Sequence, residues 1–186
     1  MDEGGHAAIV PSKRLVSNAK RKGKPEASRK GEPEFFMSDG MRRLSTPWSV
    51  ASIRANQIDP MTLPAGVILD AAAGSGIQLI AFSKILKRPA LAVEIDSDVA
   101  KLCAANMHLN SEGEVQRSLD RVLVGDGCSA ESAISTYWSS LREAGTRAHP
   151  PIAMLHIDPA RPRDAQNHSL DEMEPDIKSV LKGWSS

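Results

Sequence analysis

The sequence predicts an α/β protein with a doubly wound parallel sheet, and three observations support this prediction. Short apolar runs alternate with longer segments at helical spacing, a pattern typical of parallel strands joined by crossover helices. Hydrophobic residues make up 41% of the chain and aromatic residues 4%, so the core must be mostly aliphatic. A run of small residues at 71–76 follows the first strong strand, where open α/β sheets bind ligands.

The predicted elements follow one another along the chain, beginning with a helix. Thr46 is expected to cap a helix that begins at Pro47 and ends near Gln57, because proline suits the first helical position. After a linker, Val67-Ile68-Leu69 has the continuous apolar character of a buried parallel strand. From there we predict strands at 67–70, 90–95, 121–124 and 153–157, alternating with helices near 76–86, 97–109, 129–144 and 174–182.

Three regions are expected along the 186 residues. Residues 1–33 have almost no apolar periodicity, so we expect a disordered basic tail, which is an RNA-contacting arm, a localisation signal or a solvated segment without a role. Residues 34–66 form a helical segment with a linker, and residues 67–186 form one ligand-binding domain. The basic residues of the tail are Lys13, Arg14, Lys20, Arg21, Lys22, Lys24, Arg29 and Lys30.

Composition excludes several classes of protein. The 23 basic and 23 acidic residues cancel, so any bias toward nucleic acid must be local. Cys103 and Cys128 have neither disulfide nor metal-ligand spacing, and His6, His108 and His168 have no partner spacing that suggests a metal. No secretory signal is visible, and no apolar run reaches the ~20 residues that span a bilayer. We therefore expect a cytoplasmic protein without a membrane or metal partner.

The segment from Asp70 to Gln78 is the strongest functional signal. Its small residues, including Ala72, Gly74 and Gly76, let the backbone approach a ligand closely at the end of a strand, which predicts a nucleoside ligand. Leu79 stands where a dinucleotide motif needs glycine, and the loop lacks the Gly-Lys-Ser/Thr of a phosphate-binding loop. Asp70 would repel phosphate but suits the sulfonium and amino groups of S-adenosylmethionine, which is the predicted cofactor.

Acidic residues also end the second and third predicted strands. Glu94 is placed to accept hydrogen bonds from the ribose hydroxyls, while Asp96 either faces the adenine or caps the next helix. Asp126 is placed to accept a hydrogen bond from the adenine amino group, and Gly127 leaves room for the ring. One such acid is as often a helix cap, but three at successive strand ends favour a nucleoside site.

The fourth predicted strand ends in Asp158-Pro159, and we expect catalysis there. A carboxylate beside a backbone carbonyl can hold the N–H groups of an amine and aim its lone pair at a methyl group, although Asp158 alternatively caps a turn. His156 lies within this apolar strand, so a hydrogen-bonded core histidine is favoured over a catalytic one. Trp48 and Trp138 are expected to pack in the core.

These residues resemble a known family, the class I methyltransferases of the trimethylguanosine synthase-like group, which modify guanine N2 in RNA. The resemblance extends from about Phe36 to Asp176 and implies a Rossmann-like fold that binds S-adenosylmethionine. It also implies that Thr46 and Pro47 close over the cofactor while Asp158 and Pro159 face the base. The matching stretches are Leu44-Ser45-Thr46-Pro47, Asp70 to Phe82, Val93-Glu94-Ile95-Asp96, Asn106, Gly125-Asp126 and Asp158-Pro159-Ala160-Arg161.

Together these arguments give a predicted set of site residues. Asp158 and Pro159 are the catalytic candidates. Arg161 is the substrate-binding candidate, because the guanine-specific enzymes have an aromatic residue at that place and a guanidinium can also stack on a base. The cofactor-binding candidates are Thr46, Pro47, Asp70, Ala72, Gly74, Gly76, Gln78, Glu94, Asp96, Asp126 and Gly127.

The resemblance covers only part of the family's fold. The family has a seven-stranded sheet, of which strands in the order 3-2-1-4 are expected here, so the strand at 153–157 would be an exposed edge. The chain is then a fragment, or another chain or the N-terminal segment covers that edge. The leading function is methylation of an exocyclic amino group on an RNA base. One alternative is a truncated nucleoside-binding module without turnover. The other is a nicotinamide-dependent oxidoreductase, which Leu79 and Asp70 disfavour.

Overall fold

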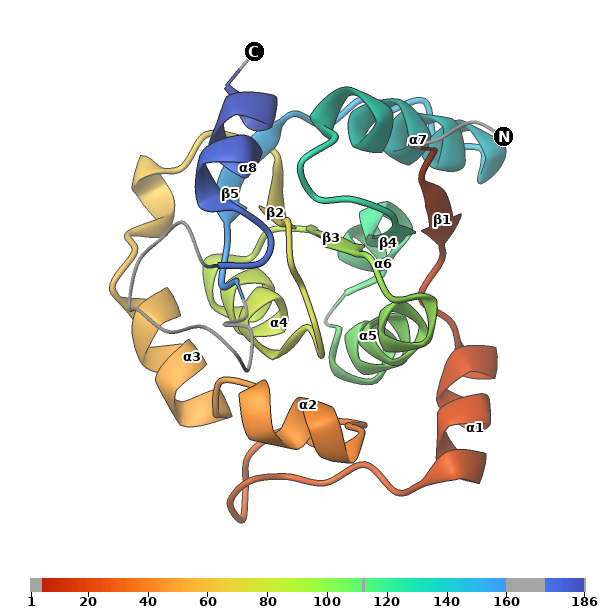
Figure 1. Ribbon diagram of the computed structural model, residues 1–186, viewed down its shortest axis with the longest axis vertical. Helices are drawn as coiled ribbons and strands as arrows, with labels where there is room; N and C mark the ends of the chain where they lie inside the picture. Colours follow the sequence, from red (N-terminus) through yellow and green to blue (C-terminus); the bar gives the residue numbers. More distant parts are fainter. Residues whose placement is uncertain (1–4, 112, 160–172, 186) are drawn as a thin grey trace.

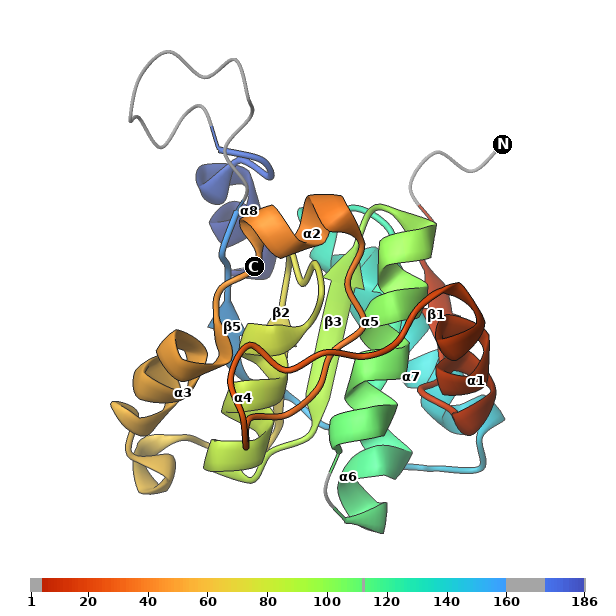
Figure 2. The same cartoon turned by 90° about the horizontal axis from the view of Figure 1, so that it is seen from below.

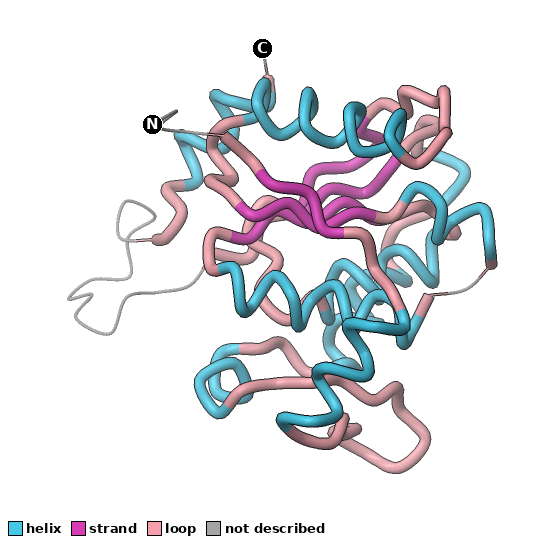
Figure 3. The backbone as a smooth tube through the Cα atoms, turned by 90° about the vertical axis from the view of Figure 1, so that its right-hand side faces the viewer, coloured by secondary structure: helices cyan, strands magenta, loops and turns pink. Residues whose placement is uncertain are grey.

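A five-stranded mixed sheet lies between two layers of helices (Figures 1 and 3). The computed structural model describes residues 5–111, 113–159 and 173–185. The strand order is β1-β4-β3-β2-β5, in which β1 is antiparallel to β4 and the other neighbours are parallel. The strands are β1 (Ala7–Ile9), β2 (Val67–Asp70), β3 (Ala90–Glu94), β4 (Arg121–Val124) and β5 (Ile152–His156).

Helices cover both faces of the sheet. On one face lie α3, α4 and α5, whose core includes Ile68, Ala92 and Val122, and on the other lies α7, which packs on Leu69 and Leu123. None of the helices in the described ranges is long and apolar enough to cross a membrane. The helices are α1 (Lys13–Lys22), α2 (Asp39–Leu44), α3 (Trp48–Asn56), η1 (Pro60–Thr62), α4 (Ile77–Leu86), α5 (Ser97–Asn110), α6 (Glu114–Leu119), α7 (Ala130–Glu143) and α8 (Ile177–Trp184).

The strands and helices predicted between 67 and 182 are present at their expected places, and so is the helix expected after Pro47. Strand β2 is buried along its whole length, as its continuous apolar run predicts. Trp48 and Trp138 both pack against the hydrophobic core, which confirms their expected role. The sequence does not predict three short elements, α2, η1 and α6, because each has six residues or fewer and shows no clear period.

The N-terminal segment differs from the expectation of a disordered tail over residues 1–33, because residues 7–9 form a strand and residues 13–22 form a helix. Residues Ala7–Ile9 pair with Val122–Val124 as an antiparallel strand, which also makes the sheet mixed rather than wholly parallel. Helix α1 then buries Ala19 and packs Leu15 and Val16 beside Ala105 of α5. Few apolar residues are enough to fold this segment, because they pack on a surface formed by residues distant in the sequence. The local composition does not reveal that surface.

Strand β5 lies at the end of the sheet, as expected for the strand at 153–157. The N-terminal segment does not cover it, because β1 pairs with β4 at the opposite edge. Within the described residues, β5 pairs only with β2. The four parallel strands have the spatial order β4-β3-β2-β5, which matches the predicted order of these four segments.

Candidate functional site

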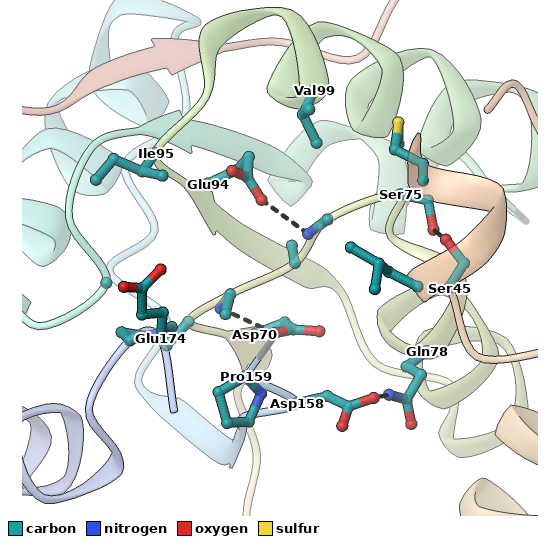
Figure 4. Close-up of a pocket in the computed structure, with 18 of the residues that line it drawn as sticks. Ser45, Asp70, Ser75, Gln78, Glu94, Ile95, Val99, Asp158, Pro159 and Glu174 are labelled. Atoms are coloured by element: carbon teal, nitrogen blue, oxygen red, sulfur yellow. Dashed lines mark hydrogen bonds between the residues drawn. The ribbon is translucent and has the colours of Figure 1, made fainter. Parts of the chain in front are cut away.

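The carboxyl ends of the four parallel strands meet at a pocket of about 910 Å³ (Figure 4). Parallel strands end at the same edge of a sheet, so the loops after β2, β3, β4 and β5 converge there. Helix α2 and residues 174–176 complete the wall. The predicted site residues that line the pocket are Thr46, Asp70, Ala72, Gly74, Gln78, Glu94, Asp126, Gly127, Asp158 and Pro159.

Three predicted residues do not line the pocket, and each has a local structural role. Asp96 accepts hydrogen bonds from the backbone N–H groups of Asp98 and Val99, so it takes the alternative role of capping α5. Gly76 begins α4 with φ of 79°, and a side chain there would meet Cys103 Sγ at 2.8 Å. Pro47 precedes the first turn of α3. Arg161 lies outside the described residues.

Glu94 joins two of the strand-end loops. Its Oε2 accepts a hydrogen bond from the Gly74 backbone N–H at 2.9 Å (Figure 4), and its Oε1 accepts one from the Asp96 backbone N–H at 2.9 Å. The carboxylate is therefore fixed in the pocket wall with lone pairs still available to a ligand, since each oxygen can accept a second bond. Ile95 follows it and is 76% exposed, which presents an apolar side chain at the pocket.

Asp70 is the most deeply buried acid of the pocket. Its Oδ1 accepts a hydrogen bond from the Ala72 backbone N–H at 3.1 Å. Burial raises its pKa to about 7, and the charges of Asp158 and Glu94 act in the same direction. The Nε2 atom of His156 lies 4.0 Å from Asp70 Oδ2 and has no hydrogen-bond partner within the described structure. The prediction of a hydrogen-bonded core histidine is therefore wrong for this nitrogen. Burial also lowers the pKa of His156.

The loop after β4 is held from both sides. Asp126 accepts a hydrogen bond from the Cys128 backbone N–H through Oδ1, and its backbone carbonyl lies 3.0 Å from His6 Nε2 of the N-terminal segment. Trp184 of α8 donates to the Gly127 carbonyl at 2.8 Å. A Cβ on Gly127 would lie 2.0 Å from the Ala71 carbonyl oxygen, so only glycine permits this close approach of two strand-end loops.

Asp158 is part of a polar cluster that connects three segments. It accepts a hydrogen bond from Gln78 Nε2 (Figure 4) and another, at 3.1 Å, from Thr46 Oγ1. Arg54 of α3 donates to Gln78 Oε1 at 2.6 Å, and its guanidinium lies 3.7 Å from Asp158 Oδ2. The hydroxyl of Thr46 is thus bonded to Asp158 instead of capping α3, so that part of the sequence prediction is wrong. Sequence reasoning misses Arg54, because a cation on a helix normally faces solvent.

The segment before α3 closes one side of the pocket. Ser45 and Ser75 are linked by a hydrogen bond of 3.0 Å between their hydroxyls (Figure 4). Asn106, fully buried in α5, donates to the carbonyls of Phe36 and Ser75 and accepts from the Phe36 backbone N–H. These bonds tie the 36–45 segment to the small-residue loop. The sequence points to Ser45 and Asn106 only through the family resemblance, and it does not single out residues 174–176 as part of the wall.

The charges of the pocket have one sign. Among the described residues that line it, no Lys, Arg or His is present, and the acids are Asp70, Glu94, Asp126, Asp158, Glu174 and Asp176. Within the described parts of the chain, no group of three or more His, Cys, Asp or Glu side chains is arranged to hold a metal ion. The arrangement suits a ligand with positive charge and hydroxyl or amino donors, and it disfavours a phosphate.

No protein family model, curated protein or solved structure matched this chain.

Proposed function

We propose that this protein binds S-adenosylmethionine in the pocket and methylates an exocyclic amino group of an RNA base, of the guanine N2 type. The observation that carries the proposal is the convergence of Asp70, Glu94, Asp126 and Asp158 from four parallel strand ends around a loop of small residues. The order of the four parallel strands supports it, since it equals the order 3-2-1-4 in the class I methyltransferase sheet that the sequence resembles.

The residues present fit this cofactor. Ligand pockets commonly measure about 300–1,000 Å³, and the volume of about 910 Å³ admits a nucleoside with an amino-acid side group. S-adenosylmethionine supplies a methyl group on a positively charged sulfur, and it also carries a positive amino group. An acidic wall without a cation stabilises both charges, whereas it would repel the pyrophosphate of a dinucleotide.

Individual residues can be assigned to parts of the cofactor. Glu94 would accept hydrogen bonds from the ribose hydroxyls, because both of its oxygens are held in place by backbone donors. Asp126 would accept from the adenine amino group, and the exposed side chain of Ile95 would pack on the ring. Asp70 would face the positive part of the ligand, with the Ala72 and Gly74 backbone close by.

Asp158 and Pro159 would receive the acceptor amine. The Asp158 carboxylate is held by Thr46, Gln78 and Arg54, so it is oriented before a substrate arrives. A carboxylate and a neighbouring backbone carbonyl would accept the two N–H bonds of an exocyclic amine and direct its lone pair. Catalysis would then consist mainly of positioning and exclusion of water. Arg161, proposed to stack on the base, lies outside the described residues.

The test is calorimetric titration with S-adenosylmethionine, S-adenosylhomocysteine and NAD, followed by an assay of labelled methyl transfer to RNA. The informative variant is Glu94→Gln, which keeps the shape of the side chain and removes its charge. Its control is Asp98→Asn, which changes an exposed acid outside the pocket. We expect saturable binding of both adenosyl compounds, at least tenfold weaker binding in Glu94→Gln, and unchanged binding in Asp98→Asn.

The outcomes separate the candidate functions. Binding with label transferred to RNA supports the proposed enzyme. Binding without transfer to any RNA would leave a nucleoside-binding module without turnover. Binding of NAD with neither adenosyl compound bound would overturn both and favour a nicotinamide-dependent protein.

A further inference from the structure

Helix α1 presents a basic face to solvent. Its apolar side is occupied, because Leu15, Val16 and Ala19 pack beside α5. A helix places every third or fourth residue on one face, so Lys13 and Arg21 lie on the side opposite to this packing. Both side chains are exposed. The ordered N-terminal segment therefore fixes positive charges in place instead of spreading them along a disordered tail.

Beyond α1 the exposed charges are mixed, because Glu26, Glu34 and Asp39 lie among Lys24, Arg29, Lys30 and Arg43. The segment that joins α1 to α2 crosses α5 and α4 (Figure 2), and it is held there by Asn106 and Asn110 through the Phe36 and Glu34 backbone. Helix α2 lines the pocket and carries Arg43 on its exposed side. We call this array of exposed cations the basic surface, and it consists of Lys13, Arg14, Lys20, Arg21, Lys22, Lys24, Arg29, Lys30 and Arg43. None of the ion pairs between described residues involves a cation of the basic surface.

A hollow lies beside this surface and shares Arg14 with it. It measures about 760 Å³ between β1, α1 and α5, and Arg14, Ser12, Asn18 and Lys101 contribute polar groups to its wall. Lys101 also pairs with Asp98 at 2.9 Å, in an exposed position where such a pair contributes little. The hollow therefore offers two cations and several hydrogen-bond donors to an anionic group.

We infer that the basic surface binds the phosphate backbone of the RNA whose base enters the pocket. This inference rests on the proposed function for the identity of the polyanion. A membrane is a poor partner, because the apolar side of α1 is buried against α5 and has nothing to insert. An extended polyanion fits better, since α1 alone spans about 15 Å and carries exposed cations along its length. Phosphate contacts would fix the position of the RNA, while the pocket selects the base.

The experiment measures RNA binding by fluorescence anisotropy of a labelled 20-nucleotide single-stranded RNA over a series of salt concentrations. The variant is Arg14→Gln with Arg21→Gln. The matched control is Arg142→Gln with Arg147→Gln, which removes two exposed cations from the other side of the sheet. We expect roughly tenfold weaker binding in the first variant, and a salt dependence of log K against log salt that is shallower by about 1.4.

Two further readouts keep the inference distinct from the proposed function. Thermal unfolding of each variant shows whether α1 is still folded, and titration with S-adenosylhomocysteine shows whether the pocket is intact. Wild-type RNA affinity in the folded Arg14/Arg21 variant, equal losses in both variants, or tighter binding of polyglutamate than of RNA would each overturn the inference. If the wild-type protein binds RNA but no cofactor, the proposed function is wrong and the inference about the basic surface still holds.

Discussion

The pocket and the basic surface differ in both charge and construction. The pocket is acidic and is built from strand ends whose carboxylates accept hydrogen bonds from loop backbone N–H groups, as Glu94 and Asp126 illustrate. The basic surface consists of exposed side chains on α1 and the segment after it, which packs on the domain through few apolar residues. A formal charge of zero therefore conceals two regions of opposite sign, one suited to a small cation and the other to a polyanion.

The two regions therefore have different roles. The pocket holds its polar groups in fixed positions, and the basic surface supplies positive charge. Several groups in the pocket, such as Asp70, Glu94 and Gln78, are fixed by partly buried hydrogen bonds, so small changes of shape there should be costly. Long exposed cations tolerate changes of shape, and their effect depends on number and on salt. Substitutions that alter shape should thus damage the pocket most, and substitutions that alter charge should act in both regions.

The largest effect is expected for Gly127→Ala. The new Cβ would lie 2.0 Å from the Ala71 carbonyl oxygen, so two strand-end loops must separate. We expect a loss of about 1–3 kcal/mol in the free energy of unfolding and roughly hundredfold weaker cofactor binding, measured by denaturant titration and calorimetry. Gly23→Ala at the end of α1 is the control, because a Cβ added there would have no atom within 4 Å. Equal stability of the two variants would contradict the account.

A smaller effect is expected for Arg54→Met. The substitution removes the donor to Gln78 and the charge beside Asp158, while about half of the Arg54 side chain is exposed. Unfolding free energy should change by less than about 1 kcal/mol. Methyl transfer should fall by roughly tenfold, because the acceptor carboxylate loses its orientation, and cofactor affinity should stay the same. Arg142→Met serves as the control in the same assays, and a loss of cofactor affinity in Arg54→Met alone would refute a role confined to Asp158.

The pocket should also respond to pH through Asp70. Its pKa in the folded protein, about 7, is raised above the ordinary value of 3.8, so folding favours the protonated form. The resulting stabilisation is complete below the ordinary pKa of 3.8, and it is lost progressively as the pH rises from there through 7, by a few kcal/mol at most. Denaturant titrations from pH 5 to pH 8 should show this fall in the wild type and a weaker fall in Asp70→Asn.

Asp120→Asn is a control that shows whether an effect of Asp70→Asn on cofactor affinity arises from the pocket or from the removal of any buried acid. The pKa of Asp120 is also raised to about 7, mainly by desolvation, but Asp120 lies before β4 at the other end of the sheet and accepts a bond from Ala90. Asp120→Asn should therefore change the pH dependence of stability in the same direction. Cofactor affinity between pH 6 and 7.5 should rise with pH in the wild type and in Asp120→Asn, and should be flat in Asp70→Asn. A rise that persists in Asp70→Asn would exclude this carboxyl as the cause.

The smallest effect is expected for Ile95→Ser. The side chain is 76% exposed, so stability should be nearly unchanged. Loss of apolar contact with a ligand ring should weaken cofactor binding by a few-fold, equivalent to roughly 1 kcal/mol. Leu181→Ser, at an exposed position on α8, is a matched control. Equal affinities for both variants would remove Ile95 from the site.

Much of the pocket could be predicted from the sequence because its signals are local. Strands β2 and β3 are apolar runs that end in Asp70 and Glu94, and Asp126 comes two residues after β4, so strand order alone brings the three acids together. Asp96 shows the limit of this reasoning. It has the same relation to its strand, yet its carboxylate caps α5, and the choice between cap and ligand depends on the turn geometry.

The remaining features depend on contacts between distant segments. Ala7–Ile9 becomes a strand only because the edge of β4 is available, and a basic, proline-containing stretch gives no hint of that pairing. Arg54 joins the site because α3 packs on α4 and brings its guanidinium to Gln78. The neighbours of Thr46 predict a helix cap, but its hydroxyl meets Asp158, which is 112 positions away in the sequence.

The most direct test of the central claim is a crystal structure of the protein with S-adenosylhomocysteine bound at saturation. We expect the ligand in the acidic pocket, with the Glu94 carboxylate within hydrogen-bond distance of the ribose hydroxyls and Asp126 near the adenine amino group. An empty pocket, or a ligand bound elsewhere on the molecule, would contradict it.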